Sequence, residues 1–101
     1  MGPDYIDPGF HAEAAGHSSY NLDTWMTPPD KLNETFIALS KNADISIIEG
    51  VMGFYDGGED GISSTAAIAK QLNAPVILVL DCKSVGYSIA ATALGFREYD
   101  K

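Results

Sequence analysis

The sequence has little cysteine and few basic residues, and both shortages restrict its function. Its 101 residues include one cysteine, Cys82, so no disulfide can form within the chain, and a reducing compartment such as the cytoplasm is expected. Six Lys and Arg stand against 14 Asp and Glu, which gives a formal net charge of −8. This balance argues against nucleic acid and against an anionic membrane surface as partners, because both require clustered Lys and Arg.

Long apolar runs and internal repeats are also missing. No run reaches the roughly 18–20 apolar residues of a membrane span, and the N-terminus lacks the basic and apolar regions of a signal peptide. The hydrophobic content of 46% is nevertheless ordinary for a globular protein. The length suits one domain, so the sequence predicts a single folded unit without a membrane anchor.

Helical spacing of apolar residues and the signals at segment ends predict four helices. Thr27 is expected to cap one of them, with Pro28 in the first position, and Ser63 or Ser64 is expected to cap another. The expected helices cover residues 9–15, 28–42, 64–72 and 84–94, the last of them ended by Gly95.

Two short apolar runs predict buried β-strands. Residues 45–48 are rich in isoleucine, and residues 76–80 form an unbroken apolar run between Pro75 and Asp81. A helix joins the two runs, which predicts a β-α-β unit of parallel strands with a right-handed crossover, and hence an α/β fold. About three strands are needed for a stable sheet. A further strand must therefore come from residues 1–20, from outside the chain or from a second copy, and self-association is expected.

Acidic residues follow the first predicted strand, at the sheet end where α/β folds bind ligands. Glu49 comes directly after residues 45–48, and Asp56 lies in the sequence Phe-Tyr-Asp-Gly-Gly. A carboxylate there can hold Mg²⁺ beside nucleotide phosphates. The alternatives are a helix-capping or solvent-facing Glu49 and an Asp56 that serves only its own turn.

A second acidic pair, Asp4 and Asp7, lies between Pro3 and Pro8. In a tight turn both carboxylates can face one pocket, and the prolines would rigidify it. The alternative is a pair of ordinary turn aspartates. No other residues offer a clear site. His11 and His17 are interpreted as surface or hydrogen-bonding histidines, Cys82 as an inert thiol, and Ser63-Ser64 as a cap. The chain also lacks a Gly-x-x-x-x-Gly-Lys-[Ser/Thr] phosphate-binding loop.

Five sequence segments, in their order along the chain, resemble the sequences of one enzyme family. No single segment is long, so their order carries the resemblance. The series resembles cobyrinic or hydrogenobyrinic acid a,c-diamide synthases, the ATP-dependent amidating enzymes of cobalamin biosynthesis, over nearly the whole chain. The segments are GPDYIDPGFH at 2–11, NLDTWM at 21–26, ADISIIEGVMGFYDG at 43–57, SSTAAIAKQLNAPVILVLD at 63–81 and SIAATALGF at 88–96.

The resemblance implies a P-loop NTPase-like, dethiobiotin-synthetase-like α/β domain, with flanking helices on a parallel sheet. Residues 1–101 are expected to be an incomplete part of this ATP-binding domain. The P-loop strand would precede them, and a C-terminal glutamine amidotransferase domain would follow. The implied cofactors are ATP and Mg²⁺. The implied partners are a corrinoid, cobyrinic acid, and ammonia from glutamine, which attacks acyl phosphates of the a- and c-acetate groups. The isolated chain is expected to be inactive.

The resemblance also assigns roles to individual residues. Asp4 and Asp7 match the acidic pair of the family's Gly-Pro-Asp-Tyr-x-Asp-Pro motif, and Ile6 stands where members often carry Leu. The implied catalytic residues are Asp56 and Asp7, the implied substrate-binding residues are Asp4, Tyr5 and Ile6, and the implied metal ligands are Glu49 and Asp4.

Other protein classes fit some of the same features. Nickel-sirohydrochlorin a,c-diamide synthase, cobyric acid synthase and dethiobiotin synthetase are near relatives within the enzyme class. A non-catalytic α/β module, such as a relative of the partition ATPases, is the alternative from another class. The net charge of −8 argues against it, because a basic or amphipathic surface for DNA or membrane would be expected there.

Overall fold

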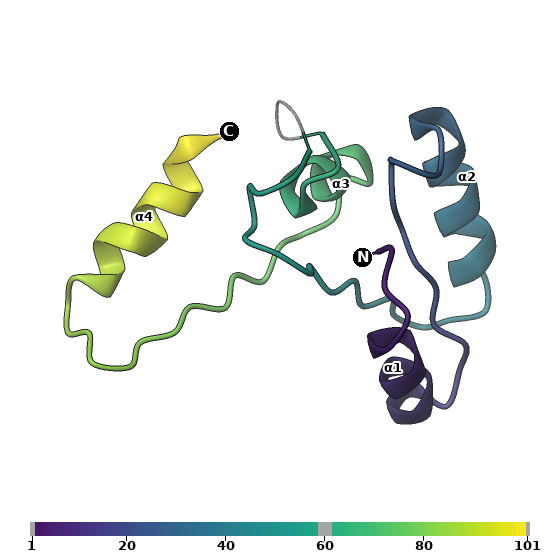
Figure 1. The fold of residues 1–101 in the computed structure, drawn as a ribbon, viewed down its shortest axis with the longest axis horizontal. Coiled ribbons are helices and arrows are strands. Elements are labelled where there is room, and N and C mark those ends of the chain that lie inside the picture. Colours follow the sequence, from purple (N-terminus) through teal and green to yellow (C-terminus); the bar gives the residue numbers. More distant parts are fainter. Residues whose placement is uncertain (1, 59–61, 101) are drawn as a thin grey trace.

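The computed structural model describes residues 2–58 and 62–100, and four α-helices lie within them. Each predicted helix has a counterpart. α1 and α2 lie at one end of the molecule and α4 at the other, with α3 between them (Figure 1). The helices are α1 (Asp7–Ala15), α2 (Pro29–Ser40), α3 (Thr65–Gln71) and α4 (Ile89–Tyr99).

The predicted cap of α3 is confirmed, and that of α2 is wrong. Ser64 precedes α3 with an extended backbone, and its hydroxyl accepts the N–H of Ala67 at 3.1 Å. Pro28 occupies the N-cap position of α2 and makes no side-chain bond there. Its ψ of 142° is extended, so the helix begins at the next proline and Thr27 lies one residue too early to cap it.

The predicted bounds of α4 are also wrong at both ends. Ser84 has a φ of 59°, in the left-handed region, so the helix cannot begin there and starts at Ile89. Gly95 does not end the helix, which continues to Tyr99. A glycine inside a helix costs about 1 kcal/mol relative to alanine. Contacts that Phe96 and Tyr99 make with Tyr55 offset that cost.

The hydrophobic core is small and lies between α2 and α3. Leu32 and Ile68 are fully buried, and Leu22 is nearly so. Partly buried side chains that pack around them are Phe36, Ile48 and Leu72. The radius of gyration is 14.9 Å, against about 13 Å for a compact domain of 100 residues. The chain is therefore more open than a domain that has closed a complete core.

An aromatic cluster connects α4 to the centre of the molecule. Tyr55 and Phe96 stack with ring centroids 5.8 Å apart, and the Tyr55 hydroxyl donates to the Phe96 carbonyl at 2.6 Å. Phe54 and Tyr99 extend the cluster on either side. These contacts hold α4 against the loop that carries Asp56.

The two segments predicted as strands are not paired in the structure. No β-strand is assigned within residues 2–58 and 62–100. Exposure nevertheless alternates along residues 76–80, whereas within residues 45–48 all but Ile48 are exposed. Ile45 and Ile47 are exposed whereas Ile48 packs on the core, and Ile77 and Val79 are more exposed than their neighbours. A period of two is typical of extended chain with one covered face. The parallel sheet therefore stays a prediction.

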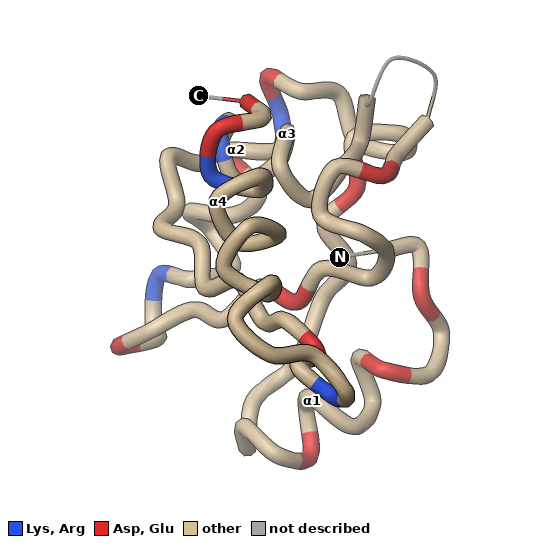
Figure 2. Tube along the Cα trace, turned by 90° about the vertical axis from the view of Figure 1, so that its left-hand side faces the viewer, with Lys and Arg blue, Asp and Glu red and all other residues tan. Residues whose placement is uncertain are grey.

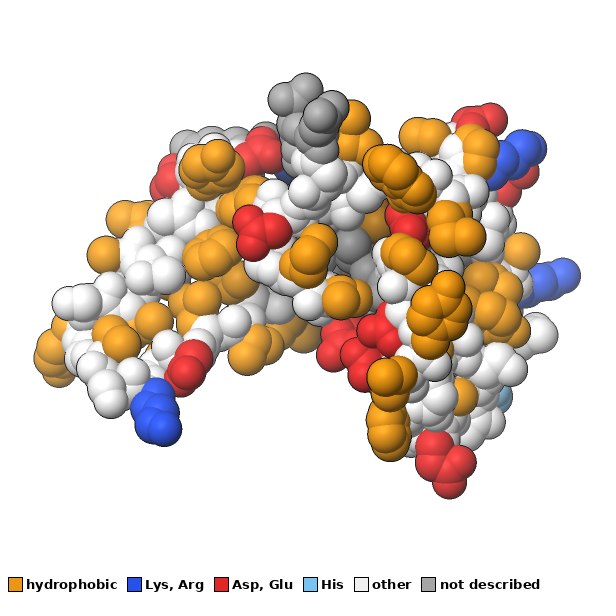
Figure 3. Space-filling model, in the orientation of Figure 1, with side chains coloured by type: hydrophobic (Ala, Val, Ile, Leu, Met, Phe, Trp, Pro, Cys, Tyr) orange, Lys and Arg blue, Asp and Glu red, His pale blue; other side chains and the backbone are white. Residues whose placement is uncertain are grey.

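Charge and apolarity are spread unevenly over the surface. Lys and Arg are scattered along the trace and form no basic stripe on the part of the chain that Figure 2 draws in colour. Apolar side chains are widely exposed, and acidic ones gather beside the N-terminal end of α1 (Figure 3). No helix in the described ranges is long and apolar enough to cross a bilayer.

Candidate functional site

The acidic pair at the N-terminus forms a tight turn that leads into α1. The Oδ1 atom of Asp4 accepts the backbone N–H groups of Ile6 at 2.7 Å and of Asp7 at 3.0 Å. Asp7 is the first residue of α1, so Asp4 satisfies an amide at a helix start that would otherwise lack a partner. Asp4 therefore has the turn role that its sequence context predicted as an alternative, and this role places it beside Asp7.

The segment 21–26 holds this turn in place. The Asn21 amide accepts the N–H of Asp4 at 3.3 Å and donates to the Asp4 carbonyl at 3.0 Å. The Gly2 N–H donates to the Leu22 carbonyl at 3.3 Å. Two of the five motif segments are thus joined by hydrogen bonds, which gives Asn21 a structural function that sequence analysis did not assign.

The two turn carboxylates have opposite pKa shifts. The backbone N–H groups of Ile6 and Asp7 lower the pKa of Asp4, because they bind its ionised form. The negative charge of Asp4 raises the pKa of Asp7, and the charge of Glu49 adds to this effect. His11 opposes it. The turn therefore combines an anion that is held ionised with a neighbour that takes up a proton more readily.

Glu49 is brought to this turn by a contact with α1. Its Oε2 atom lies 2.9 Å from the Nε2 atom of His11. His11 is in the second turn of α1, and Glu49 follows the extended segment 45–48. The structure therefore joins the first and third motif segments through His11 and Glu49, and Asp7 lies close enough to both Asp4 and Glu49 for their charges to raise its pKa.

Asp56 lies in a separate turn that depends on Gly53. The Asp56 N–H donates to the Gly53 carbonyl at 2.9 Å, and the carboxylate folds back over Gly53. A Cβ atom on Gly53 would overlap Asp56 Oδ2. Gly57 is equally restricted, since a Cβ there would lie 2.8 Å from both the Ile62 carbonyl oxygen and the Ser64 nitrogen. These glycines are therefore required for the position of Asp56.

A hollow of about 250 Å³ connects Asp56 to the N-terminal segment. It lies between the start of the chain, the loop after Glu49 and the start of α3. The hydroxyls of Ser63 and Thr24 are in direct contact beside it. Its lining residues are Gly2, Pro3, Val51, Met52, Asp56, Ser63 and Thr65.

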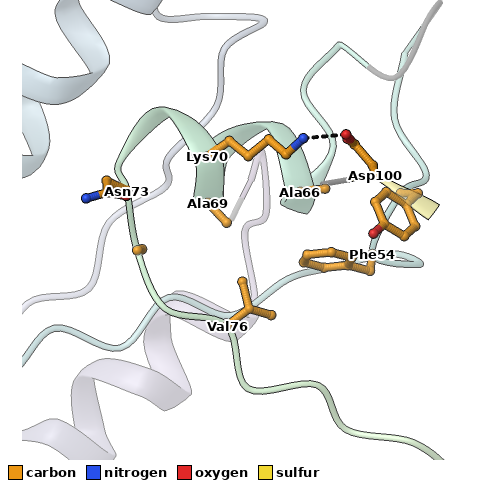
Figure 4. Close-up of a pocket in the computed structure, with 9 residues that line it drawn as sticks. Phe54, Ala66, Ala69, Lys70, Asn73, Val76 and Asp100 are labelled. Carbon is orange, nitrogen blue, oxygen red and sulfur yellow. Dashed lines mark hydrogen bonds and ion pairs between the residues drawn. The ribbon is translucent and has the colours of Figure 1, made fainter. Parts of the chain in front are cut away.

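A second hollow of about 260 Å³ lies on the other side of α3, under the end of α4. Figure 4 shows Phe54 and Val76 along one wall and the ion pair of Lys70 with Asp100 above them. None of the predicted site residues lines it. It is formed where α4 joins the rest of the chain.

The remaining residues that the sequence singled out have exposed side chains or lie in simple turns. Tyr5 and Ile6 project into solvent, with 97% and 70% of their surfaces exposed. Cys82 is exposed. Asp81 accepts the Lys83 N–H at 2.8 Å, which is a turn contact. Exposure leaves Tyr5 and Ile6 accessible to a ligand, and their predicted role in substrate binding remains a prediction.

The carboxylates supply the type of ligand that Mg²⁺ prefers. Mg²⁺ is usually bound through one or two carboxylates together with waters and substrate phosphates. Within residues 2–58 and 62–100, no three His, Cys, Asp or Glu side chains form a group that could hold a metal. The donors thus suit Mg²⁺ shared with a phosphate and do not form a metal cage of their own.

Sequence analysis missed several residues of this arrangement. The interpretation of His11 as a surface or hydrogen-bonding histidine agrees with its contact to Glu49, but the partner itself was not predicted. Asp23 is 5% exposed, and its Oδ1 accepts the Trp25 N–H at 2.7 Å. Both residues, like Asn21, lie inside the motif segments 2–11 and 21–26. The position of these residues within the motifs was therefore the available signal, although their partners could not be read from it.

Comparison with known proteins confirms the resemblance. The chain is 53% identical over 99% of its length to a cobyrinate a,c-diamide synthase of Salmonella typhimurium and covers 22% of it. It is 50% identical over its whole length to a cobyrinate a,c-diamide synthase of Picrophilus torridus, covering 23%. A hydrogenobyrinate a,c-diamide synthase of Streptomyces coelicolor is 47% identical over 99% of the chain, which covers 21% of it. No family model and no solved structure matches the chain.

The matches concern one segment of longer proteins. The chain spans about a fifth of the length of the curated relatives it matches. It is homologous to that segment from end to end, so the residues described above have counterparts in a longer enzyme.

Proposed function

Because the chain aligns from end to end with one segment of the cobyrinate and hydrogenobyrinate a,c-diamide synthases, we propose that it acts as part of such an enzyme. The reaction is the ATP-dependent amidation of the a- and c-acetate carboxylates of cobyrinic acid, with ammonia from glutamine. The observation that carries the proposal is the identity of 53% over 99% of the chain. The contacts among the motif segments support it, because Asn21 holds the Asp4 turn and His11 joins α1 to Glu49.

The chemical difficulty of this reaction lies in the carboxylate. A carboxylate is a poor acyl donor, and phosphorylation by ATP provides it with a leaving group. We assign Glu49 and Asp4 to hold Mg²⁺, which would neutralise charge on the transferring phosphoryl group. The lowered pKa of Asp4 suits this role, because the residue stays ionised.

The other acidic residues are assigned to the substrate. Asp56 and Asp7 orient the reacting carboxylate and ammonia, and Tyr5 and Ile6 offer an exposed surface to the corrin ring. The raised pKa of Asp7 makes it the better proton acceptor of the turn pair. Asp56 faces the hollow that also contacts Gly2 and Pro3, so a substrate group in that hollow would lie next to the turn of Asp4.

We also propose that residues 45–48 and 76–80 are strands of a parallel P-loop-like sheet once partner strands are present. The alternating exposure of residues 76–80 supports this, and so does the open apolar surface at Ile47 and Val79, which each have more than four-fifths of their surface in solvent. In the isolated chain the same edges are expected to drive self-association. The single cysteine supports a cytoplasmic location.

A segment exchange tests the proposed activity. Residues 1–101 replace the matched segment of the Salmonella synthase, and the purified hybrid is given ATP, Mg²⁺, glutamine and a panel of tetrapyrrole acids. We expect cobyrinic acid to gain two amide groups, detected by mass spectrometry. Nickel-sirohydrochlorin as the preferred substrate would favour the related nickel enzyme. A folded hybrid that amidates no tetrapyrrole would contradict the proposal.

The isolated chain provides the matching negative test. We expect no glutamine-dependent or ammonia-dependent ATP turnover by the 101 residues alone, because the chain has no phosphate-binding Gly-Lys-[Ser/Thr] loop. Measurable ATP turnover would show that these residues bind phosphate without such a loop. It would contradict the proposal that the rest of the enzyme supplies phosphate binding.

A further inference from the structure

We propose that His11 is a positioning residue that fixes the carboxylate of Glu49 in the orientation the site requires. The inference rests on the proposed function, and it adds a residue to that site for which the motifs assigned no role. Its basis is the contact of 2.9 Å between His11 Nε2 and Glu49 Oε2.

The contact joins one ring nitrogen to one carboxylate oxygen. His11 Nε2 and Glu49 Oε2 lie 2.9 Å apart, which is within the range of an N–H···O hydrogen bond. A ring N–H on Nε2 can donate to this oxygen in the neutral or in the protonated imidazole. The inference therefore places a hydrogen on Nε2, directed at one oxygen of Glu49.

The two residues come from elements of different rigidity. His11 lies within α1, and the helix is anchored at its start by the Asp4 turn. Glu49 lies between an extended segment and Gly50, in a stretch without helix or strand. A long side chain in such a stretch has several rotamers of similar energy. The contact with α1 contributes to restricting this carboxylate, at the helix that begins with Asp7.

The pair has little value for stability alone. The two side chains are 43% and 52% exposed, and exposed ion pairs contribute roughly 0–1 kcal/mol. Loss of the contact is thus expected to leave the fold intact while changing the orientation of Glu49. Groups that orient a metal-binding carboxylate typically affect metal affinity or activity about 10–100-fold.

The first test uses the 101-residue chain and needs no activity. Nitrogen-15 NMR of the histidine rings is expected to show a hydrogen held on His11 Nε2, and Glu49→Gln is expected to shift that resonance. Glu34→Gln is the matched control, since Glu34 is an exposed glutamate that contacts Lys31. The inference would be overturned by nitrogen-15 shifts that show both His11 tautomers in exchange, or by a His11 resonance that Glu49→Gln does not move. Either result counts whether or not the hybrid enzyme is active.

The second test uses the hybrid enzyme with the Salmonella segments. His11→Phe keeps a ring but removes the donor, and His11→Gln restores an N–H at a similar reach. We expect His11→Phe to raise the Mg²⁺ concentration for half-maximal rate about 10–100-fold, with His11→Gln recovering most of the loss. His17→Phe is the control at the other histidine.

The outcomes separate the inference from the proposed function. An inactive parental hybrid would count against the proposed function, and the NMR test alone would then decide the contact. An active hybrid whose Mg²⁺ requirement is unchanged by His11→Phe would overturn the positioning role. A loss of rate that comes only from less folded protein, with the same Mg²⁺ dependence, would also overturn it.

Discussion

The Oδ1 atom of Asp4 accepts the backbone N–H of Asp7 at 3.0 Å, so the two carboxylates of the motif are held in one turn. This proximity gives them opposite pKa shifts, lowered for Asp4 and raised for Asp7. The ordinary value for both is 3.8. Asp4 thus stabilises the folded chain above this value and loses that effect as the pH falls through its lowered pKa. Asp7 has the opposite sign, and its destabilising charge develops as the pH rises through its raised pKa.

A substitution series at this turn tests the electrostatic order. Asp4→Asn keeps the oxygen acceptor and removes the charge, so the pKa of Asp7 should fall. Glu49→Gln should lower it by a smaller amount, and His11→Phe should raise it. Carbon-13 NMR titration of the Asp7 carboxyl measures each shift, with Asp30→Asn as the distant control. An Asp7 pKa that does not respond to Asp4→Asn would contradict the described turn.

The turn of Asp56 predicts a separable effect on activity. Gly53→Ala introduces a Cβ atom that overlaps Asp56 Oδ2, which is the mobile end of a side chain. The carboxylate should move while the backbone remains in place, and displacement by about 1 Å can reduce a rate on the order of 100-fold. The amidation rate of the hybrid enzyme and its urea unfolding curve are the measurements.

A matched glycine serves as the control for that substitution. A Cβ atom on Gly95 meets nothing within 4 Å, and Gly95 lies inside α4. Gly95→Ala should therefore retain activity and raise the free energy of unfolding by roughly 0.5–1 kcal/mol through helix propensity. Equal activities of the Gly53 and Gly95 variants would show that the position of Asp56 is not limiting.

The cap of α3 gives a prediction about stability. Ser64→Ala removes the bond from the Ala67 N–H and should lower the free energy of unfolding by about 1 kcal/mol. Ser88→Ala is the matched control, because Ser88 precedes α4 without a side-chain capping bond. Urea denaturation of the parent chain and of both variants measures the free energy of unfolding. An equal loss in the two variants would contradict the predicted contribution of the Ser64 cap.

The exposed segments predict how the isolated chain associates. Ile47→Lys and Val79→Lys place a charge among the exposed apolar side chains of each segment, which should weaken pairing between copies. Ile37→Lys on α2 introduces the same charge at an exposed helical position and should have less effect. Sedimentation velocity over a range of concentrations measures the average mass. A chain that stays monomeric at every concentration would refute the proposed self-association.

Local sequence signals predicted the presence of the helices better than the residues at which they begin and end. The cap at Ser64 depends on a hydroxyl and an amide three residues apart, and it was predicted correctly. The C-terminal end of α4 was predicted wrongly. The helix continues through Gly95, and Phe96 and Tyr99 pack on Tyr55. That packing depends on residues 40 or more positions away in the chain, which no local pattern reports.

The order of short motifs was enough to identify the relatives and the acidic residues worth testing. It was also enough to place four helices, because helix formation depends on neighbouring residues. Tertiary structure alone decided that Asn21 holds the Asp4 turn and that His11 meets Glu49. Such contacts depend on how separate segments pack, and a sheet depends on partner strands in the same way. The helices were therefore predictable from the chain, whereas the arrangement of the acidic site required its folded form.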